Sequence, residues 1–247
     1  MGEAKSKKIV PFEESKLSKK EQIANMFDDI AFRYDFLNHF MSLGIDRIWR
    51  RKALHYLDDL QPGSLLDVAA GTADFTILAE KILHPQKLKG IDISPQMLEI
   101  GRKKVNRAGL GHKITLETGD SEDLPYETGT FDAVTSAYGV RNFEQLEKGL
   151  EEMYRVLRKG GKAVILDFST PTVFPVKQLY RLYFRYITPA LGKWIARSKE
   201  AYAYLPESVD SFPQGDSMIE KLKKSGFEKV ICKKLTFGIC SVYCATK

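Results

Sequence analysis

Between residues 64 and 168, short apolar runs alternate regularly with longer segments in which apolar residues recur at helical spacing. This alternation constrains the fold most, because short apolar runs separated by helical segments are typical of β-α-β units and of a parallel sheet covered by helices. We predict strands at 64–69, 88–92, 112–117, 131–138 and 162–168, and helices at 74–83, 95–107 and 144–158. The pattern therefore indicates an α/β fold.

The end of the chain adds a different kind of strand pair. After a helix near 216–224, two apolar runs at 228–235 and 239–246 are joined by Phe237-Gly238, which favours an antiparallel hairpin at the edge of the sheet. We expect a doubly wound sheet of seven strands, mostly parallel with this C-terminal antiparallel hairpin. In such a sheet a ligand lies beyond the carboxyl ends of the strands.

The length of 247 residues fits one domain, spanning 1–247, with two additions to the sheet. Ser18 and Glu21 form a capping box in front of a helical pattern, and residues 1–60 are expected to form an N-terminal helical cap. Residues 171–212, rich in aromatic side chains, are expected to form an insertion that covers the substrate.

Positive charge is concentrated in two segments. The chain has 38 Lys and Arg against 32 Asp and Glu, and residues 168–199 hold six Lys or Arg and no acid, while residues 1–20 hold six Lys and three Glu. No uncharged apolar run approaches the ~18 residues of a membrane span, and the Lys-rich start lacks a signal-peptide pattern. We therefore expect a cytoplasmic protein. Three cysteines without Cys-x-x-Cys spacing and four isolated histidines give no reason to expect a metal site.

Polar residues follow three consecutive strands. Asp67 and Gly71 stand in the small-residue loop after the first strand, and Asp92 ends the second, where a carboxylate can accept both hydroxyls of a ribose. Asp120 and Ser121 follow the third strand, where they could bind the amino group of adenine. Each acid alone could equally cap the following helix. Together they predict an adenosine site.

The loop after the first strand lacks the Gly-x-Gly-x-x-Gly spacing of dinucleotide sites, because Ala70 and Ala73 flank its single Gly71. A ligand without phosphate fits better. S-adenosylmethionine is such a ligand, and its amino and carboxylate groups could meet the loop and an early acid such as Asp67.

Several longer strings lie around these strand ends. They are Phe27-Asp28-Asp29-Ile30-Ala31, Tyr34-Asp35, Asn38, Met41-Ser42-Leu43-Gly44, Trp49, Ala137-Tyr138-Gly139-Val140-Arg141-Asn142-Phe143, Met153-Tyr154-Arg155-Val156-Leu157, Asp167-Phe168-Ser169, Ala201-Tyr202-Ala203-Tyr204-Leu205-Pro206-Glu207-Ser208 and Phe212-Pro213. With them the sequence resembles, almost end to end, the UbiE/MenG family of quinone-biosynthesis C-methyltransferases, which have the class I methyltransferase fold. The family usually has glycine where Ala70 and Ala73 stand, so an alanine methyl is expected to narrow the loop.

The resemblance implies that S-adenosylmethionine is the cofactor and that the chain methylates a ring carbon of a prenylated demethylquinol. It implies cofactor contacts for Thr72, Asp92, Asp120 and Ser121, and we add Ala137 at the end of the fourth strand. Likeness to the menaquinone-type members favours demethylmenaquinol, with a benzoquinol of ubiquinone biosynthesis as the alternative.

A neutral quinol carbon is a poor nucleophile, so the protein must stabilise negative charge on the neighbouring ring oxygen. Arg141, just past the fourth strand, is our candidate for this role because a guanidinium stays protonated and binds oxyanions well. A water held by Arg141 and Asn142, or a tyrosine such as Tyr34 or Tyr138, could carry the proton. The alternative for Arg141 is a surface ion pair.

Residues 176–187 read as a basic amphipathic helix. We expect Tyr180, Tyr183, Phe184 and Tyr202 to contact substrate or membrane, so that the protein binds peripherally to the inner face of the cytoplasmic membrane. A helix packed on the sheet is the simpler alternative. The sequence leaves open whether the chain forms a homodimer.

Two other functions compete with quinol methylation. A nucleic-acid methyltransferase is disfavoured because Ser136-Ala137-Tyr138-Gly139 replaces the Asx-Pro-Pro-aromatic motif and no cysteine precedes Cys232, so we expect no nucleic-acid partner. A non-catalytic protein that binds S-adenosylmethionine and acts in an assembly remains open. A nicotinamide oxidoreductase is least favoured, given the missing glycines.

Overall fold

The computed structural model of the chain describes residues 9–12, 14–42, 44–183 and 199–247. At its centre is a seven-stranded sheet with the strand order β3-β2-β1-β4-β5-β7-β6. The strands are β1 (Ser64–Val68), β2 (Lys87–Asp92), β3 (Ile114–Thr118), β4 (Phe131–Ala137), β5 (Leu157–Phe168), β6 (Lys229–Leu235) and β7 (Cys240–Thr246). The first five pair in parallel, and β7 is antiparallel to both β5 and β6. The predicted doubly wound sheet with its C-terminal antiparallel pair is confirmed.

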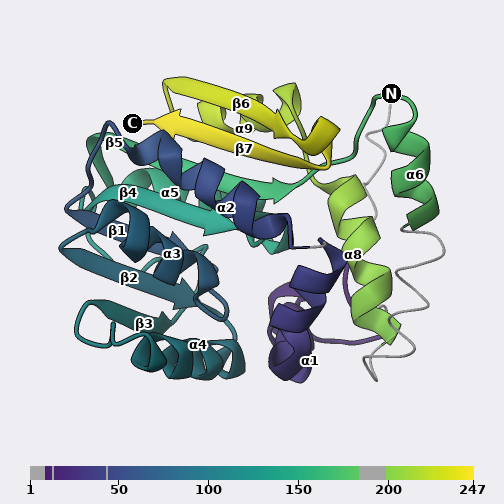
Figure 1. Ribbon diagram of the computed structural model, residues 1–247, viewed down its shortest axis with the longest axis horizontal. Helices are drawn as coiled ribbons and strands as arrows, with labels where there is room; N and C mark the ends of the chain where they lie inside the picture. The colour runs from purple at the N-terminus through teal and green to yellow at the C-terminus, as the bar shows by residue number, and fades with distance from the viewer. Residues whose placement is uncertain (1–8, 13, 43, 184–198) are drawn as a thin grey trace.

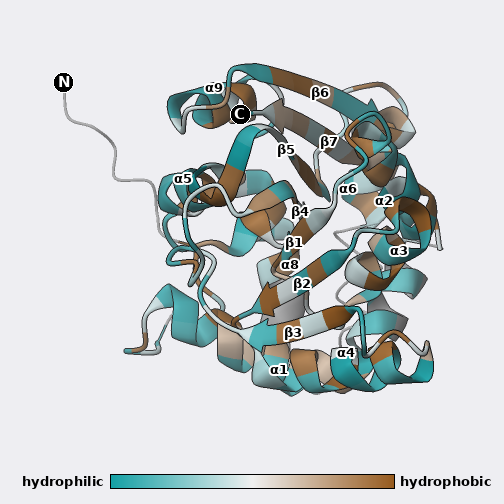
Figure 2. Ribbon diagram, turned by 90° about the vertical axis from the view of Figure 1, so that its left-hand side faces the viewer, coloured by the Kyte–Doolittle hydropathy of each residue, from teal (hydrophilic) through white to brown (hydrophobic). Residues whose placement is uncertain are grey.

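Helices cover both faces of the sheet, as Figure 1 shows. On one face, α2 (Asp46–Leu54), α3 (Asp74–Leu83) and α4 (Pro95–Arg107) bury residues such as Trp49, Phe75 and Leu98 against the strands. On the other face, α5 (Leu146–Val156) and α9 (Asp216–Lys224) bury Leu150 and Met218 in a second cluster. In Figure 2 apolar colour is frequent along the strands, whereas the surrounding helices alternate apolar and polar stretches. The two buried clusters, one on each face of the sheet, hold the strands and thereby fix where their carboxyl ends lie.

Two further helices stand beyond the carboxyl ends of the parallel strands. The arrowheads of these strands point toward α1 (Lys19–Met41) and α8 (Lys199–Ser211) in Figure 1. These two helices are in contact, since Ile23 and Met26 of α1 form a small buried cluster with Tyr204 of α8. The N-terminal capping box is present, with the Ser18 N–H and hydroxyl both donating to Glu21 at 2.8 Å. The short helix α6 (Val176–Leu182) and the turns η1 (His55–Leu57), η2 (Val140–Asn142) and η4 (Thr236–Gly238) complete the described elements.

One predicted boundary is wrong. The sequence suggested a helix over 144–158 and a strand beginning at 162, but α5 ends at Val156 and β5 begins at Leu157. Lys159-Gly160-Gly161 therefore lies inside the strand, where the pairing register with β4 shifts between Phe131 and Ala133. A side chain at Gly161 would lie 2.8 Å from the carbonyl oxygen of Asp132, so the two backbones approach closely here. The glycines mark an irregular strand rather than a loop.

The predicted helix over 176–187 is described only as far as Tyr183, and residues 184–187 lie outside the described part of the chain. None of the helices in the described ranges is both long and apolar enough to cross a bilayer.

Candidate functional site

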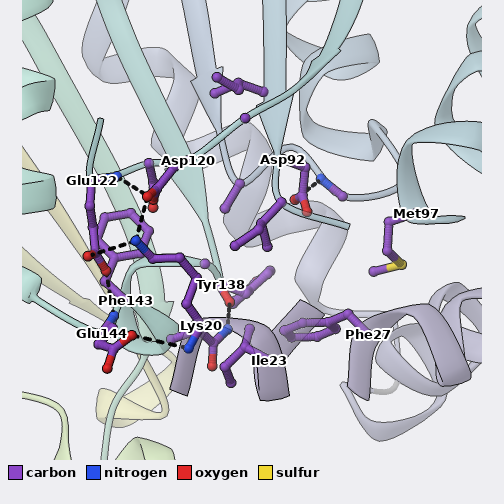
Figure 3. Close-up of a pocket in the computed structure, with 18 of the residues that line it drawn as sticks. Lys20, Ile23, Phe27, Asp92, Met97, Asp120, Glu122, Tyr138, Phe143 and Glu144 are labelled. Atoms are coloured by element: carbon purple, nitrogen blue, oxygen red, sulfur yellow. Dashed lines mark hydrogen bonds and ion pairs between the residues drawn. The ribbon is translucent and has the colours of Figure 1, made fainter. Parts of the chain in front are cut away.

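A pocket with about 670 Å³ of empty space lies at the carboxyl ends of the first four strands, and we call it the strand-tip pocket. The loops after β1, β2, β3 and β4 form one side, and Lys20, Ile23, Phe27 and Tyr34 of α1 form the other. Figure 3 shows Lys20 reaching from α1 toward Asp120, with Asp92 on the opposite side. The pocket brings together seven of the predicted site residues: Tyr34, Gly71, Asp92, Asp120, Ser121, Ala137 and Asn142.

Asp92 ends β2 and bridges the two loops beside it. Its Oδ2 accepts the N–H of Gly71 at 2.7 Å, and its Oδ1 accepts the N–H of Ser94 at 2.8 Å. Burial raises the pKa of Asp92 from 3.8 to about 6, although both N–H donors oppose the shift. Each carboxylate oxygen has a second lone pair, so Asp92 can still accept hydrogen bonds from a ligand in the pocket.

The opposite end of the pocket holds an ion cluster that the sequence did not predict. The Lys20 ammonium pairs with the carboxylate of Asp120 and lies 3.3 Å from Oε2 of Glu122. Burial lowers the pKa of Lys20, but its hydrogen bond to Asp120 and the charges of Glu122 and Asp120 outweigh this, so the pKa is raised. Lys20 is therefore a fixed positive charge beside the predicted adenine position.

Helix α1 is held over the pocket by polar contacts along its length. Near its middle, Asp28 accepts the hydroxyl of Ser94 at 2.5 Å and the N–H of Gln96 at 3.1 Å, at the start of α4. Further along, Asp35 accepts the Thr72 hydroxyl and pairs with the ammonium of Lys104, each at 2.5 Å. Together with Lys20, these contacts make α1 a wall of the site.

Two predicted cofactor residues do not reach the pocket. Asp67 is 1% exposed and accepts hydrogen bonds from the hydroxyls of Thr76 at 2.6 Å and Thr135 at 2.8 Å. Burial raises its pKa to about 6, while the two threonines oppose this. Thr72 is also buried and directs its hydroxyl to Asp35. Both side chains connect the loop to its surroundings rather than line the empty space.

The side chains of Ala70 and Ala73, in the loop after β1, lie outside the strand-tip pocket. Ala70 and Ala73 are buried and absent from the pocket wall, and a side chain at Gly90 would lie 2.9 Å from the Ala70 methyl. Ala73 adopts a φ of 63°, a left-handed conformation that costs an alanine roughly 1–2 kcal/mol. Ala69 and Gly71 face the pocket instead. The methyls of Ala70 and Ala73 therefore do not line the strand-tip pocket.

The end of β4 carries a buried polar cluster. Arg141 donates from Nη1 to Oδ1 of Asp167 at 2.8 Å and to the carbonyl of Tyr138, and its guanidinium lies 5.5 Å from the ring centre of Phe168. Burial lowers the pKa of Arg141, but the Asp167 carboxylate more than compensates, so the pKa is raised. Arg141 is therefore buried and charged, which excludes a surface ion pair.

Asn142 and Tyr34 line the strand-tip pocket close to this cluster, whereas Arg141 lies just behind its wall. Burial raises the pKa of Tyr34, opposed by the charge of Arg141. Tyr138, with a φ of 63°, stacks on Phe168 at 4.7 Å between ring centres. A left-handed conformation at a non-glycine residue stores strain and is frequent at functional sites.

Of the residues predicted to contact substrate or membrane, Tyr180 and Tyr183 are half-buried, and burial raises the pKa of both. Phe184 lies outside the described residues, and for Tyr202 only the backbone, within α8, is described. The exposed apolar side chains of α6 are Leu179 at 64% and Leu182 at 55%. Within the described ranges, no three His, Cys, Asp or Glu side chains gather as metal ligands would.

The pocket also contains residues that sequence reasoning missed, namely Lys20, Phe27, Met97, Glu122 and Phe143. The sequence does offer a signal for two of them: Phe27 begins the motif Phe27-Asp28-Asp29-Ile30-Ala31, and Glu122 directly follows the predicted site residue Ser121. Nothing local marks Lys20, because its partner Asp120 lies 100 positions away.

Comparison with known proteins supports this arrangement. A profile of the ubiE/COQ5 methyltransferase family matches residues 15–247. The demethylmenaquinone methyltransferase of Bacteroides fragilis is 49% identical over 229 residues, which are 93% of this chain and 94% of that protein. The ubiquinone/menaquinone biosynthesis C-methyltransferase UbiE of a Geobacter species is 45% identical over 230 residues, covering 93% and 97%.

Solved structures extend the likeness to the fold. A SAM-dependent methyltransferase from Thermotoga maritima aligns with a TM-score of 0.57 at 20% identity, over 90% of this chain and 99% of that one. At this identity the likeness concerns the fold alone. The profile and the relatives show more: the chain is a member of the ubiE/COQ5 methyltransferase family.

Proposed function

We propose that this protein transfers the methyl group of S-adenosylmethionine to a ring carbon of demethylmenaquinol. The proposal rests on one observation: a pocket suited to adenosine lies next to a buried positive charge. A pocket bounded by Asp92 and Asp120 adjoins a buried, permanently charged Arg141 with a pocket-lining Asn142 beside it. Relatives named demethylmenaquinone methyltransferase, at 49% and 40% identity, support the choice of acceptor.

The residues of the strand-tip pocket fit S-adenosylmethionine. Its acids stand at opposite ends, and the pocket wall also includes the apolar side chains of Ile91, Met97 and Phe143, which suit a flat purine. Asp92 would accept the ribose hydroxyls, and Asp120 the adenine amino group. Gly71, with a φ of +54°, lets the loop backbone approach the ligand. Ala137 and Ser121 complete the wall.

The cofactor supplies an electrophilic sulfonium methyl group, so the protein has to orient the acceptor and increase electron density on its ring carbon. Arg141 is suited to the second task because its charge is held in a buried site, where electrostatic attraction to a developing phenolate is stronger than in water. Asp167 keeps the guanidinium in place, and Asn142 presents an amide from the pocket wall. Tyr34 is a poor base, since burial raises its pKa.

The test is a competition between acceptors. Purified protein receives methyl-labelled S-adenosylmethionine together with chemically reduced short-chain demethylmenaquinone and the matching demethyl benzoquinone, and the products are separated by mass spectrometry. Label in the naphthoquinol is expected. Label only in the benzoquinol assigns the protein to ubiquinone synthesis, and cofactor binding without labelled product supports a non-catalytic role.

We also propose that the protein binds its prenylated substrate at a membrane surface. Val173, Phe174, Leu179 and Leu182 are each more than half exposed, and Arg181 is exposed between the two leucines. Apolar side chains flanked by cations favour anionic lipid surfaces. Replacing Leu179 and Leu182 by Ser should reduce co-sedimentation with phosphatidylglycerol vesicles. Replacing Ile231, 56% exposed on β6, is the control and should have no effect.

A further inference from the structure

Tyr204 lies next to the residues proposed for catalysis, although it comes from a different part of the chain. Helix α8 contacts the turn η2 that carries Arg141 and Asn142. The ring of Tyr204 packs with Ile23 and Met26 of α1, and only 4% of the residue is exposed. Tyr204 therefore stands where the N-terminal helix, the end of β4 and α8 meet.

The hydroxyl of Tyr204 is buried without a hydrogen-bond partner among the described residues. Burying an unpaired hydroxyl is unfavourable, and most buried polar groups in folded proteins are satisfied. An apolar ring would fill the same space next to Ile23 and Met26 without this cost. The packing of the helix thus explains the ring of Tyr204 and leaves its hydroxyl unexplained.

Further unpaired polar atoms lie close by in the fold. Nε of Arg141 and Oδ1 of Asn142, both in the turn η2, are also buried and lack partners within the described ranges. Tyr204 is near enough to Arg141 for the guanidinium charge to affect the pKa of the Tyr204 hydroxyl. A cluster of unsatisfied donors and acceptors is what a polar ligand would complete.

The protonation state of Tyr204 determines what it can do. Burial raises its pKa to about 12, although the positive charge of Arg141 opposes this. At neutral pH the hydroxyl is therefore protonated and can donate a hydrogen bond. A neutral donor binds an oxygen more strongly when that oxygen carries negative charge, so it favours the ionised form of a phenol that it contacts.

We infer that the hydroxyl of Tyr204 binds a ring oxygen of the methyl acceptor as a hydrogen-bond donor, alongside Arg141. This inference rests on the proposed quinol methylation and assigns α8 a direct part in the reaction. The phenol proton of the acceptor leaves to water before methyl transfer, and the negative charge left on the oxygen is shared between a guanidinium from the end of β4 and a hydroxyl from α8, which raises the ionised, nucleophilic fraction of the acceptor. No proton has to leave Tyr204.

The test is Tyr204→Phe, which keeps the ring and removes only the hydroxyl. With reduced short-chain demethylmenaquinone, kcat/KM should fall about 10- to 100-fold, the range for loss of one hydrogen bond to a charged group. Affinity for S-adenosylhomocysteine should be unchanged. Resistance to urea should be equal or higher, because the variant no longer buries an unpaired hydroxyl.

Tyr126→Phe is the matched control, since its hydroxyl donates to Glu117 at 2.7 Å, outside the strand-tip pocket. It should keep the wild-type kcat/KM. A Tyr204→Phe protein that methylates as fast as the wild type overturns the inference and leaves the proposed function standing. A drop in urea resistance with unchanged kinetics also overturns it, because the hydroxyl would then be structural. A wild type that methylates no quinol overturns both proposals.

Discussion

Binding of the adenosine group should weaken below pH 6 because of Asp92. Its carboxylate faces the pocket, and burial raises its pKa to about 6 in the cofactor-free protein. Ribose hydroxyls can donate to the ionised carboxylate but gain much less from the protonated form. Binding therefore favours the ionised state, lowers the pKa of Asp92 and releases a proton when the pH is below 6.

The size of the effect follows from the pKa. At pH 8 almost every molecule has Asp92 ionised, whereas at pH 5, one unit below a pKa of about 6, roughly a tenth do. The dissociation constant should therefore rise about tenfold between pH 8 and pH 5, which corresponds to about 1.4 kcal/mol. Close to one proton should be released for each ligand bound at pH 5.

The assay is isothermal titration calorimetry with methylthioadenosine, which has the ribose and adenine but no amino acid part that titrates in this range. Repeating it in buffers of different ionisation enthalpy counts the protons released. Asp92→Asn is the control: it should bind weakly at every pH, because an amide cannot accept from both Gly71 and Ser94, and its affinity should be flat with pH. A wild-type affinity that does not change between pH 8 and pH 5 would refute the reasoning.

Three more predictions concern the surroundings of the site. Gly149→Ala should lower the free energy of unfolding, measured in urea, by about 1–3 kcal/mol, because the new methyl group would lie 2.3 Å from the ring of Phe143. An unchanged midpoint of the urea transition would show that the ring can move away. Asp167→Ala should lower the free energy of unfolding by about 3–5 kcal/mol, because it leaves the Arg141 charge buried without its partner. The control Asp59→Ala breaks an exposed ion pair with Lys162 and should lower it by less than about 1 kcal/mol. Equal losses in the two variants would contradict this prediction. Arg141→Lys should reduce turnover while leaving affinity for S-adenosylhomocysteine nearly intact, and full turnover would remove Arg141 from the proposed oxyanion role.

The strand order and the acids at the strand ends could be predicted because their signals are local. Asp92 ends β2 and Asp120 comes two residues after the end of β3, and parallel strands bring such positions to one edge. The start of β5 could not be predicted, since Gly160-Gly161 reads as a turn and only pairing with β4 shows it to be part of a strand.

The environment of an acid depends on residues far away in the sequence. Asp67 follows the same local pattern as Asp92, yet Thr76 and Thr135 occupy its oxygens, and Thr135 is 68 positions away. The same limit applies to Lys20 and Asp120, which are brought together by the packing of α1. Sequence patterns thus located the site but not which of its polar groups face the ligand.

The attachment of α1 has a consequence for the speed of the reaction. Because this helix forms one wall of the strand-tip pocket, movement of the helix away from the sheet would widen the route by which spent cofactor leaves. Two of its attachments are ion pairs, Lys20 to Asp120 and Asp35 to Lys104. Such pairs weaken with dissolved salt. Moderate salt should therefore shorten the residence time of the product, and where product release limits turnover, the enzyme should work faster in salt than without it.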